Sequence, residues 1–247
     1  MAATVAGTLP PSTDGVLAIP ALAGERRLVH GFSTMPMGSM RADPAASSQS
    51  TPSRRALAAA LDMQTEGLAV LGAVHGARVE RVDQAAGRVE GCDGLVTDRP
   101  AVPLLATFAD CYPVLLFDPG RPALALVHAG WRGAAAGVAP EAVATLVREY
   151  GCRPADMEAG LGPGICARCY EVGEEVAFHF PSECLQPSPG GRFLLDIRAH
   201  LRGQLCDAGL LAGHIHDLRI CTRETPELPS HRRSPDGSRF ACLAALR

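Results

Sequence analysis

The stretch that decides the fold is ALALVHAGWRG, residues 123–133, in which an apolar run ends in a histidine, a tryptophan and an arginine. Two more apolar runs precede it, VPLLATF at 102–108 and PVLLFDP at 113–119. Short apolar runs bounded by turn residues are typical of buried strands. Because only the short DPGRP link separates the last two runs, they predict a β-hairpin.

Helical patterns alternate with these strands. Residues 133–151 predict a helix that ends at Gly151, and residues 53–63 predict another. Residues 67–83 alternate in polarity and predict a pair of strands around His75. Interleaved helices, strands and hairpins predict an α/β fold with mixed β-sheets flanked by helices.

The chain has neither an internal repeat nor a linker that would divide it. We therefore expect a single layered domain over residues 1–247. Residues 1–24 are rich in proline, glycine and alanine and are expected to be partly flexible. Residues 35–53 are small, polar and without periodicity, which predicts a flexible loop.

Composition excludes several classes of function. A net charge of −3 and 4% aromatic residues argue against a nucleic-acid partner. The chain contains no lysine and no asparagine, which excludes a Schiff-base lysine, a P-loop lysine and a Cys-His-Asn triad. No apolar run is long enough for a membrane span, and the first residues lack the basic start of a signal peptide. The odd count of nine cysteines indicates reduced thiols, so we expect a cytoplasmic protein.

Three residues with metal or nucleophile chemistry lie at predicted strand ends: His75, Cys111 and His128. Cys111 comes directly before one strand of the hairpin and His128 ends the other, which places both at the same end of the sheet. Two histidines and one cysteine can hold zinc with a fourth position open for water. Without a metal, the same residues offer a Cys–His nucleophile pair, and Asp110 can orient a histidine or carry a proton.

Two other motifs are weaker signals. Cys166 and Cys169 form a C-x-x-C motif, which suits redox or zinc chemistry. Since there is no second C-x-x-C, we favour a structural role for this pair. Arg233 lies in SHRRSPDG, residues 230–237, where arginine forks suit phosphate or carboxylate and a solvated loop is the alternative.

Several motifs together resemble one family. In chain order they are VHG, DGLVTDRP, ADCYPVLLFDP, ALVHAGWRGAAAGV, GPGICARCYEVGEEV and HRR, from about residue 28 to the C-terminus. The chain resembles the laccase-domain family, also called the polyphenol oxidase or purine nucleoside phosphorylase family. The resemblance implies an α/β domain related to the cytotoxic-necrotizing-factor type of cysteine hydrolase. It also implies a zinc site carried by His75, Cys111 and His128.

The activities that the resemblance implies are phosphorolysis of adenosine, inosine and methylthioadenosine, and deamination of adenosine. Copper-dependent oxidation of polyphenols and editing of peptidoglycan precursors are further activities associated with the family. The chain departs from the family pattern at several positions. Ala73 stands where glutamine is usual, Met35 where arginine is usual and His231 where tyrosine is usual, and a substrate-binding loop at 33–53 is rewritten and shortened.

The leading hypothesis is a zinc-dependent purine nucleoside enzyme that acts on a nucleoside and phosphate, as a monomer or homodimer. Arg132, beside the second metal-ligating histidine, and then Arg233 are expected to bind phosphate, and Asp110 to transfer a proton. A copper oxidase of phenols is one alternative, for which HIH at 214–216 is the one His-x-His pair. A hydrolase with Cys111 as nucleophile and a non-enzymatic metal-binding module are the others.

Overall fold

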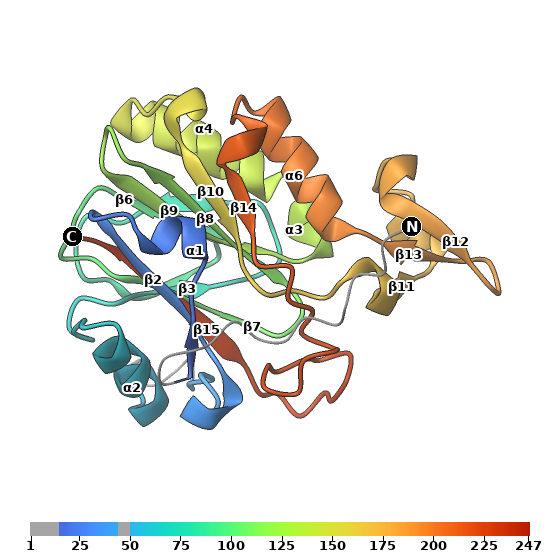
Figure 1. Ribbon diagram of the computed structural model, residues 1–247, viewed down its shortest axis with the longest axis horizontal. Coiled ribbons are helices and arrows are strands. Elements are labelled where there is room, and N and C mark those ends of the chain that lie inside the picture. The colour runs from blue at the N-terminus through green and yellow to red at the C-terminus, as the bar shows by residue number, and fades with distance from the viewer. Residues whose placement is uncertain (1–14, 44–49) are drawn as a thin grey trace.

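The computed structural model describes residues 15–43 and 50–247 of the chain. In this part of the chain two six-stranded sheets and a three-stranded sheet are accompanied by helices (Figure 1). The helices are α1 (Pro20–Ala23), α2 (Pro52–Ala60), α3 (Trp131–Ala135), α4 (Val138–Tyr150), α5 (Glu174–Ala177) and α6 (Ile197–Asp207). Short 3-10 turns span Met35–Met37, Pro154–Asp156, Ala167–Cys169, Ser182–Cys184 and Ala212–His214.

The strands form three separate sheets. The first sheet contains, in spatial order, β1 (Val16–Leu17), β2 (Leu28–Ser33), β15 (Phe240–Leu246), β7 (Leu104–Phe108), β3 (Ala69–Gly72) and β5 (Gly87–Glu90). The second contains β14 (Ile215–Asp217), β10 (Glu158–Leu161), β8 (Tyr112–Asp118), β9 (Ala123–Ala129), β6 (Gly94–Thr97) and β4 (Val79–Arg81). The small sheet contains β11 (Glu171–Val172), β13 (Arg192–Leu195) and β12 (Leu185–Ser188).

The two large sheets pack face to face, and β9 shows why. Its Ala125 and Val127 side chains join the hydrophobic cluster that includes α4, whereas Leu124 and Leu126 lie in the cluster between the two sheets. Successive side chains of a strand point to opposite faces of the sheet. Small residues therefore let the helix approach, and large residues fill the space of about 10 Å between the sheets.

Helices cover the two outer faces. Figure 1 shows α3, α4 and α6 over the second sheet and α2 beside the first. Leu57 of α2 belongs to a third cluster with Leu105 of β7 and Leu243 of β15. The result is a helix–sheet–sheet–helix arrangement, in which each large sheet has both parallel and antiparallel neighbours. The predicted α/β class with mixed sheets is confirmed, and the relation to the cytotoxic-necrotizing-factor fold stays a prediction.

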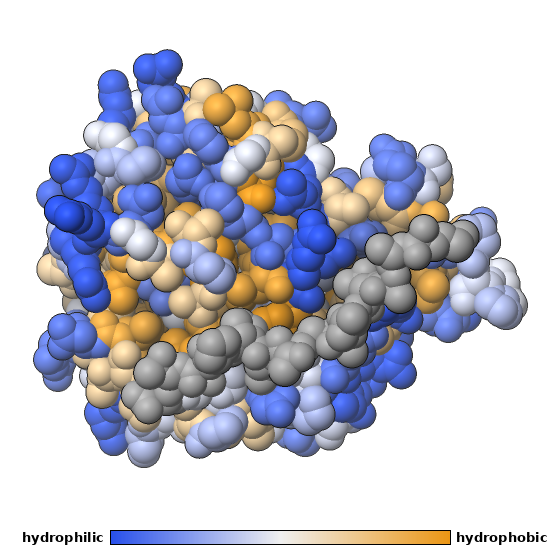
Figure 2. Space-filling model, viewed as in Figure 1, coloured by the Kyte–Doolittle hydropathy of each residue, from blue (hydrophilic) through white to orange (hydrophobic). Residues whose placement is uncertain are grey.

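Hydrophilic side chains surround the face seen in Figure 2, and hydrophobic side chains gather toward its middle. Among the described residues, no helix combines the length and the apolar composition needed to cross a bilayer.

The predicted hairpin is confirmed, because β8 and β9 pair antiparallel with Pro113 opposite His128. The predicted helix over residues 133–151 is interrupted: α3 and α4 meet at Gly137, whose φ of 81° lies in the left-handed region that favours glycine. Its predicted end at Gly151 is confirmed by a φ of 65°.

The prediction of paired strands over residues 67–83 is wrong. The strands β3 and β4 exist, but they belong to different large sheets and do not pair with each other. The alternating pattern correctly predicted two strands, but each of them pairs with strands of a different sheet. The connection that holds His75 therefore crosses from one sheet to the other.

The two segments expected to be flexible lie only partly in the described residues. Of residues 1–24, those from 15 onward form β1 and α1, and Leu17 and Ile19 are buried there. Of residues 35–53, the described part contains Met40, which is fully buried against α2. The predictions for residues 1–14 and 44–49 lie outside the described residues.

Three chain connections meet at one edge of the sheet pair. The strands β3, β5 and β7 are consecutive or neighbouring members of the first sheet, and β3 runs parallel to both others. Each is followed by a strand of the second sheet, namely β4, β6 and β8. Because parallel strands end at the same edge, all three connections leave the first sheet together. They carry His75, Asp93 and Cys111, and β9 ends there at His128 and Ala129.

Candidate metal centre

The structure brings the three predicted metal ligands together. One ligand atom each from His75, Cys111 and His128 lies within 4.8 Å of the others. The two imidazole rings are 5.0 Å apart between centroids, at an angle of 63°. His75 is exposed, whereas His128 is buried with 4% of its surface accessible. The group is therefore anchored on its inner side and open to solvent on its outer side.

Asp93 organises this group, although it is not one of its ligand atoms. Its fully buried carboxylate accepts hydrogen bonds from the backbone N–H groups of Val74, His75 and Gly76, at 3.2, 2.9 and 2.6 Å. These bonds hold His75 at a φ of 63°, an uncommon conformation for a residue with a side chain. One carboxylate therefore satisfies three donors and fixes the direction of the His75 side chain.

The same carboxylate also orients the second histidine. His128 Nδ1 lies 3.2 Å from Asp93 Oδ1, and the ring stacks on Phe108 with centroids 5.4 Å apart. A carboxylate on one ring nitrogen of a histidine leaves the other nitrogen to bind a metal and fixes its tautomer. Asp93 thus links the backbone of one candidate ligand to the ring of another.

Gly130 leaves the space that an ion among these ligands requires. A Cβ atom at this position would lie 2.9 Å from Cys111 Sγ and 3.2 Å from His75 Nδ1. Two imidazoles and a thiolate are a donor set that zinc accepts in tetrahedral sites with one open position. The residues present therefore fit a zinc-class ion.

Electrostatics favour an ionised thiol at Cys111. Burial alone raises the pKa of this thiol, but the charge and hydrogen bond of His128, with His75, outweigh it and bring the pKa to about 6. Burial likewise lowers the pKa of His128, but the Cys111 thiolate and Asp93 raise it to about 9. Without a metal, Cys111 and His128 thus form a thiolate–imidazolium pair between about pH 6 and pH 9.

This pair predicts a pH-dependent reactivity for the metal-free protein. Because the thiolate is the nucleophile, alkylation of Cys111 should rise with pH to half its maximum near pH 6, instead of near the ordinary pKa of 9. Replacing His128 by glutamine removes the positive charge and should move the midpoint upward. Iodoacetamide labelling of the Cys111 peptide, followed by mass spectrometry, measures this midpoint. A wild-type midpoint near pH 9 contradicts the prediction, and zinc should protect the thiol.

The three residues line a cavity of about 650 Å³. Its wall combines apolar side chains with aromatic and charged ones. The polar and aromatic members besides the trio are Arg88, Thr107, Asp110, Trp131, Arg132, Tyr170, His231, Arg232 and Arg239.

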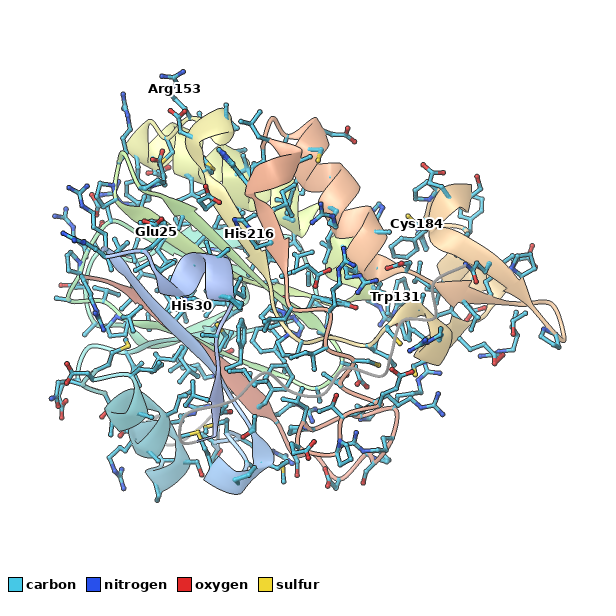
Figure 3. The ribbon with its side chains drawn as sticks, viewed as in Figure 1. Glu25, His30, Trp131, Arg153, Cys184 and His216 are labelled. Carbon is cyan, nitrogen blue, oxygen red and sulfur yellow. The ribbon has the colours of Figure 1, made fainter. Side chains whose placement is uncertain are left out.

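Arg132, the first candidate for phosphate binding, lines this cavity together with the candidate metal ligands. Its guanidinium lies over the ring of Trp131, 4.2 Å from the centroid. Trp131 begins α3 and lies toward the small sheet in Figure 3, with His179 6.0 Å away between ring centroids. Stacking on the indole ring holds the guanidinium plane while its N–H groups stay available to an anion.

Asp110 also lines the cavity, but its carboxylate is engaged. Oδ1 accepts the hydroxyl hydrogen of Thr222 at 2.6 Å, and Oδ2 accepts the backbone N–H of Arg232 at 2.7 Å. Its own φ of 83° is unusual for a residue with a side chain. Asp110 therefore ties the β7–β8 connection to the segment after β14.

Arg233 has a different place from the one predicted. It is not part of the cavity wall. Its guanidinium donates to the backbone carbonyls of Thr222, Arg223, Thr225 and Leu228, at distances from 2.5 to 3.1 Å. The guanidinium N–H groups that a phosphate would need therefore already donate to four backbone carbonyls. Its neighbours His231 and Arg232 are the residues of SHRRSPDG that reach the cavity.

Sequence reasoning missed Asp93 and Gly130, and it left the histidines of HIH open. Asp93 lies in the motif DGLVTDRP, so the motif was a signal, but its carboxylate could not be connected to histidines 18 and 35 residues away. His214 and His216 both approach Glu158 and belong to neither candidate metal group found among the described residues.

The chain is similar to known proteins. A family model described as "Multi-copper polyphenol oxidoreductase laccase" matches residues 29–247. A purine nucleoside phosphorylase of Mycobacterium bovis is 37% identical over 209 residues, which are 81% of this chain and 80% of that protein. One of Deinococcus radiodurans is 41% identical over 160 residues, which are 64% of this chain and 62% of that protein.

Two solved structures have the same fold over nearly the whole chain. YlmD from Geobacillus stearothermophilus has a TM-score of 0.85 and 28% identity, covering 97% of this chain and 98% of its own. The hypothetical protein YfiH of Bacillus licheniformis has a TM-score of 0.84 and 27% identity, covering 95% of this chain and 97% of its own. The chain belongs to the laccase-domain family, whose model matches it from residue 29 to its last residue and whose curated relatives are named purine nucleoside phosphorylases.

Proposed function

We propose that the chain is a zinc-dependent purine nucleoside phosphorylase acting on adenosine, inosine and methylthioadenosine. The observation that carries the proposal is the cavity of about 650 Å³, whose wall holds the trio His75, Cys111 and His128 with Arg132 beside it. Its volume is in the range of small-molecule sites, about 300–1,000 Å³. The names of the relatives support the same activity.

The residues of the cavity divide the work of phosphorolysis. Arg132 presents a fork that can bind two phosphate oxygens, and its stacking on Trp131 limits its motion. In the same cavity, Arg232 lies over the ring of Tyr170, with 5.1 Å to the centroid. We assign the Tyr170 ring to the face of the purine base, where an aromatic surface suits a planar ligand.

When bound, zinc at the trio supplies a Lewis acid and an acidic bound water near neutral pH. In phosphorolysis, a phosphate oxygen forms a bond to the anomeric carbon of ribose while the bond from that carbon to the base nitrogen breaks. The base leaves with the electron pair and needs a proton. Hydrogen phosphate loses its proton as it forms the ester, and Asp110 is our candidate for passing that proton to the base, since a carboxylate has about four acceptor positions and only two are used here.

The test is release of hypoxanthine from inosine by the zinc-loaded protein. We expect release together with ribose 1-phosphate only when phosphate is present. The same protein given adenosine without phosphate tests deamination, in which adenosine and water would give inosine and ammonia. Absence of phosphate-dependent release from all three nucleosides overturns the proposed function.

Arg132 allows a sharper test of phosphate binding. Replacing Arg132 by alanine should raise the KM for phosphate about 10- to 100-fold, because charge-assisted hydrogen bonds contribute about 1.5–3 kcal/mol. Lysine at this position keeps the charge but loses the fork, and should restore only part of the affinity. Arg153→Ala is the control, since Figure 3 shows Arg153 far from Trp131 on an exposed edge. Steady-state kinetics at varied phosphate decide it, and an unchanged KM in Arg132→Ala rejects the assignment.

A cysteine hydrolase is the second candidate, and one observation favours it. The Cys111 thiol with a pKa of about 6, next to His128, is the pair that a thiolate nucleophile needs. Metal-free protein that cleaves amide bonds of peptidoglycan precursors, and loses this activity when Cys111 is alkylated, would select this function. Activity that requires zinc would select the phosphorylase.

A further inference from the structure

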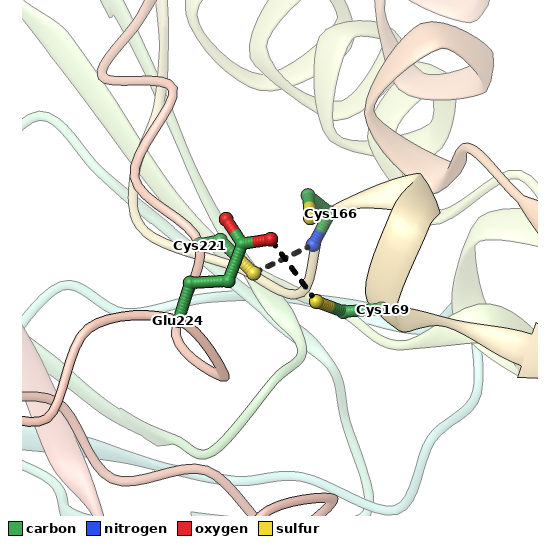
Figure 4. A group of neighbouring side chains, drawn as sticks. All are labelled: Cys166, Cys169, Cys221 and Glu224. Atoms are coloured by element: carbon green, nitrogen blue, oxygen red, sulfur yellow. Dashed lines mark hydrogen bonds between the residues drawn. The ribbon is translucent and has the colours of Figure 1, made fainter. Parts of the chain in front are cut away.

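A second group of metal-binding side chains lies outside the cavity. Cys166, Cys169, Cys221 and Glu224 each offer a ligand atom within 4.8 Å of the other three (Figure 4). Cys166 and Cys169 are the C-x-x-C motif, in which Cys166 precedes the short turn Ala167–Cys169 and Cys169 is its last residue. Cys221 and Glu224 belong to the segment after β14, more than 50 residues further along the chain. The C-x-x-C pair thus has partners that its sequence neighbourhood does not contain.

Backbone contacts hold these two segments side by side. Gly164 forms an isolated parallel bridge with Cys221, through its N–H to Ile220 and its carbonyl to Thr222, at 3.2 and 3.1 Å. The N–H of Cys166 donates to the Cys221 sulfur at 3.3 Å. These bonds are independent of any ion, so the fold places the side chains together before an ion arrives.

The side chains point at one another as a ligand set. In Figure 4, Glu224 reaches Cys169, whose Sγ lies 3.4 Å from Oε1. Cys221 is buried, and Cys166 and Cys169 are partly exposed. If the three thiols and the carboxylate all ionise, their negative charges repel one another at this distance. A divalent cation bound among them offsets that repulsion.

We propose that Cys166, Cys169, Cys221 and Glu224 form a second metal site, for a thiophilic divalent ion of the zinc class. Tetrahedral coordination with sulfur at about 2.3 Å places ligand atoms about 3.8 Å apart. The present separations of up to 4.8 Å therefore need only a small contraction. With all four positions filled by protein, the site is closed, which is typical of structural ions.

Arg168 completes the charge balance of the site. Its Nη2 atom donates to both oxygens of Glu224, at 3.1 and 3.0 Å. When one oxygen of Glu224 binds the ion, the other can still accept a hydrogen bond from the Arg168 guanidinium. Hydrogen bonds of this kind orient the ligands of metal ions. Three thiolates, a carboxylate and a dication sum to −2, and Arg168 reduces this to −1.

The ion would hold together two segments of the chain that form part of the cavity wall. Thr222 and Arg232 of the segment that contains Cys221 bind the two carboxylate oxygens of Asp110. On the C-x-x-C side, Tyr170 directly follows Cys169 and carries Arg232 over its ring. The second site thus joins both segments that position Asp110, Tyr170 and Arg232, without contributing to the chemistry itself.

Metal stoichiometry tests the proposal without reference to activity. Protein purified under reducing conditions and reconstituted with zinc should contain two ions per chain by elemental analysis. Cys111→Ala should keep one ion, and adding Cys166→Ser and Cys221→Ser should remove it. Cys206→Ser is the matched control, because Cys206 is exposed on α6 and outside both groups.

Cobalt distinguishes the two sites by their sulfur content. In Cys111→Ala, cobalt should give thiolate charge-transfer absorption from the three sulfurs of the second site. In a Cys166→Ser and Cys221→Ser variant that keeps Cys111, cobalt should give the absorption of one sulfur, that of Cys111. If the serine variant does not fold, Glu224→Gln in the Cys111→Ala background should weaken the retained ion at least about tenfold, the loss seen even for outer partners of metal ligands. Glu227→Gln is its exposed control.

Two results overturn the second site. One is a folded Cys111→Ala protein that binds no ion when it is reconstituted with zinc under reducing conditions. The other is unchanged metal content after loss of both Cys166 and Cys221. Either result leaves the proposed phosphorylase untouched, since that proposal depends on nucleoside turnover at the His75–Cys111–His128 group.

Discussion

Replacing Cys111 by alanine is expected to remove the ion held by His75 and His128 and to lower phosphorolysis at least about 10³-fold. A metal contributes several kcal/mol of charge stabilisation in a transition state, and each 1.36 kcal/mol changes a rate tenfold. The same change removes the only thiolate of the trio. Turnover of inosine with saturating phosphate, measured beside metal content, gives both readouts.

The control for this variant is Cys206→Ala, which removes an exposed thiol on α6. It should leave metal content and turnover at wild-type levels. Cys111→Ala with undiminished turnover would reject the metal-dependent phosphorylase, since that function needs Cys111 as a metal ligand. His128→Ala should reproduce the loss in the phosphorylase case.

Asparagine in place of Asp93 is expected to weaken metal binding about 10- to 100-fold, the usual effect of losing a carboxylate behind a metal-ligating histidine. The amide would have one oxygen instead of two for the N–H groups of residues 74–76 and for His128. Unsatisfied donors in this buried position should also lower the free energy of unfolding by about 1–3 kcal/mol. Metal titration and urea unfolding measure the two effects.

Asp118→Asn separates the two effects. Asp118 is also buried, at the other end of the β8–β9 hairpin, and accepts the backbone N–H groups of Gly120 and Arg121 at 2.9 Å each. Its replacement should cost stability of the same order and leave metal affinity unchanged. Equal losses of metal affinity in both variants would mean that Asp93 acts through stability alone.

Charge on Asp93 explains why the amide is a poor substitute. Burial alone opposes ionisation of this carboxyl, but the hydrogen bonds from His128 and from the backbone of Gly76 and Val74 outweigh it and lower its pKa. Because the folded protein depresses the pKa, the ionised form stabilises the fold above the ordinary pKa of Asp. That contribution is lost as pH falls through the depressed value.

The sequence by itself determined the hairpin and predicted that His75, Cys111 and His128 belong together. The apolar runs of β8 and β9 are separated by a five-residue link, so local geometry brought Cys111 near His128. His75 was a candidate from its place at a predicted strand end, and the family motifs then grouped it with Cys111 and His128. The hairpin and the proximity of the three side chains are confirmed, because the residues that decide them are close in the chain or stand in a specific motif.

Only the tertiary structure decided which distant groups support the trio. Three parallel strands of the first sheet are each followed by a strand of the second sheet, and the three connections leave at the same edge. This arrangement places the Asp93 carboxylate within hydrogen-bond distance of the His75 backbone and the His128 ring. The same long-range packing places Cys221 and Glu224 beside the C-x-x-C motif. It also places backbone carbonyls around Arg233, whose guanidinium donates hydrogen bonds to them. Such contacts depend on how layers stack, and stacking is set by the burial of many side chains at once, which no short stretch of sequence records.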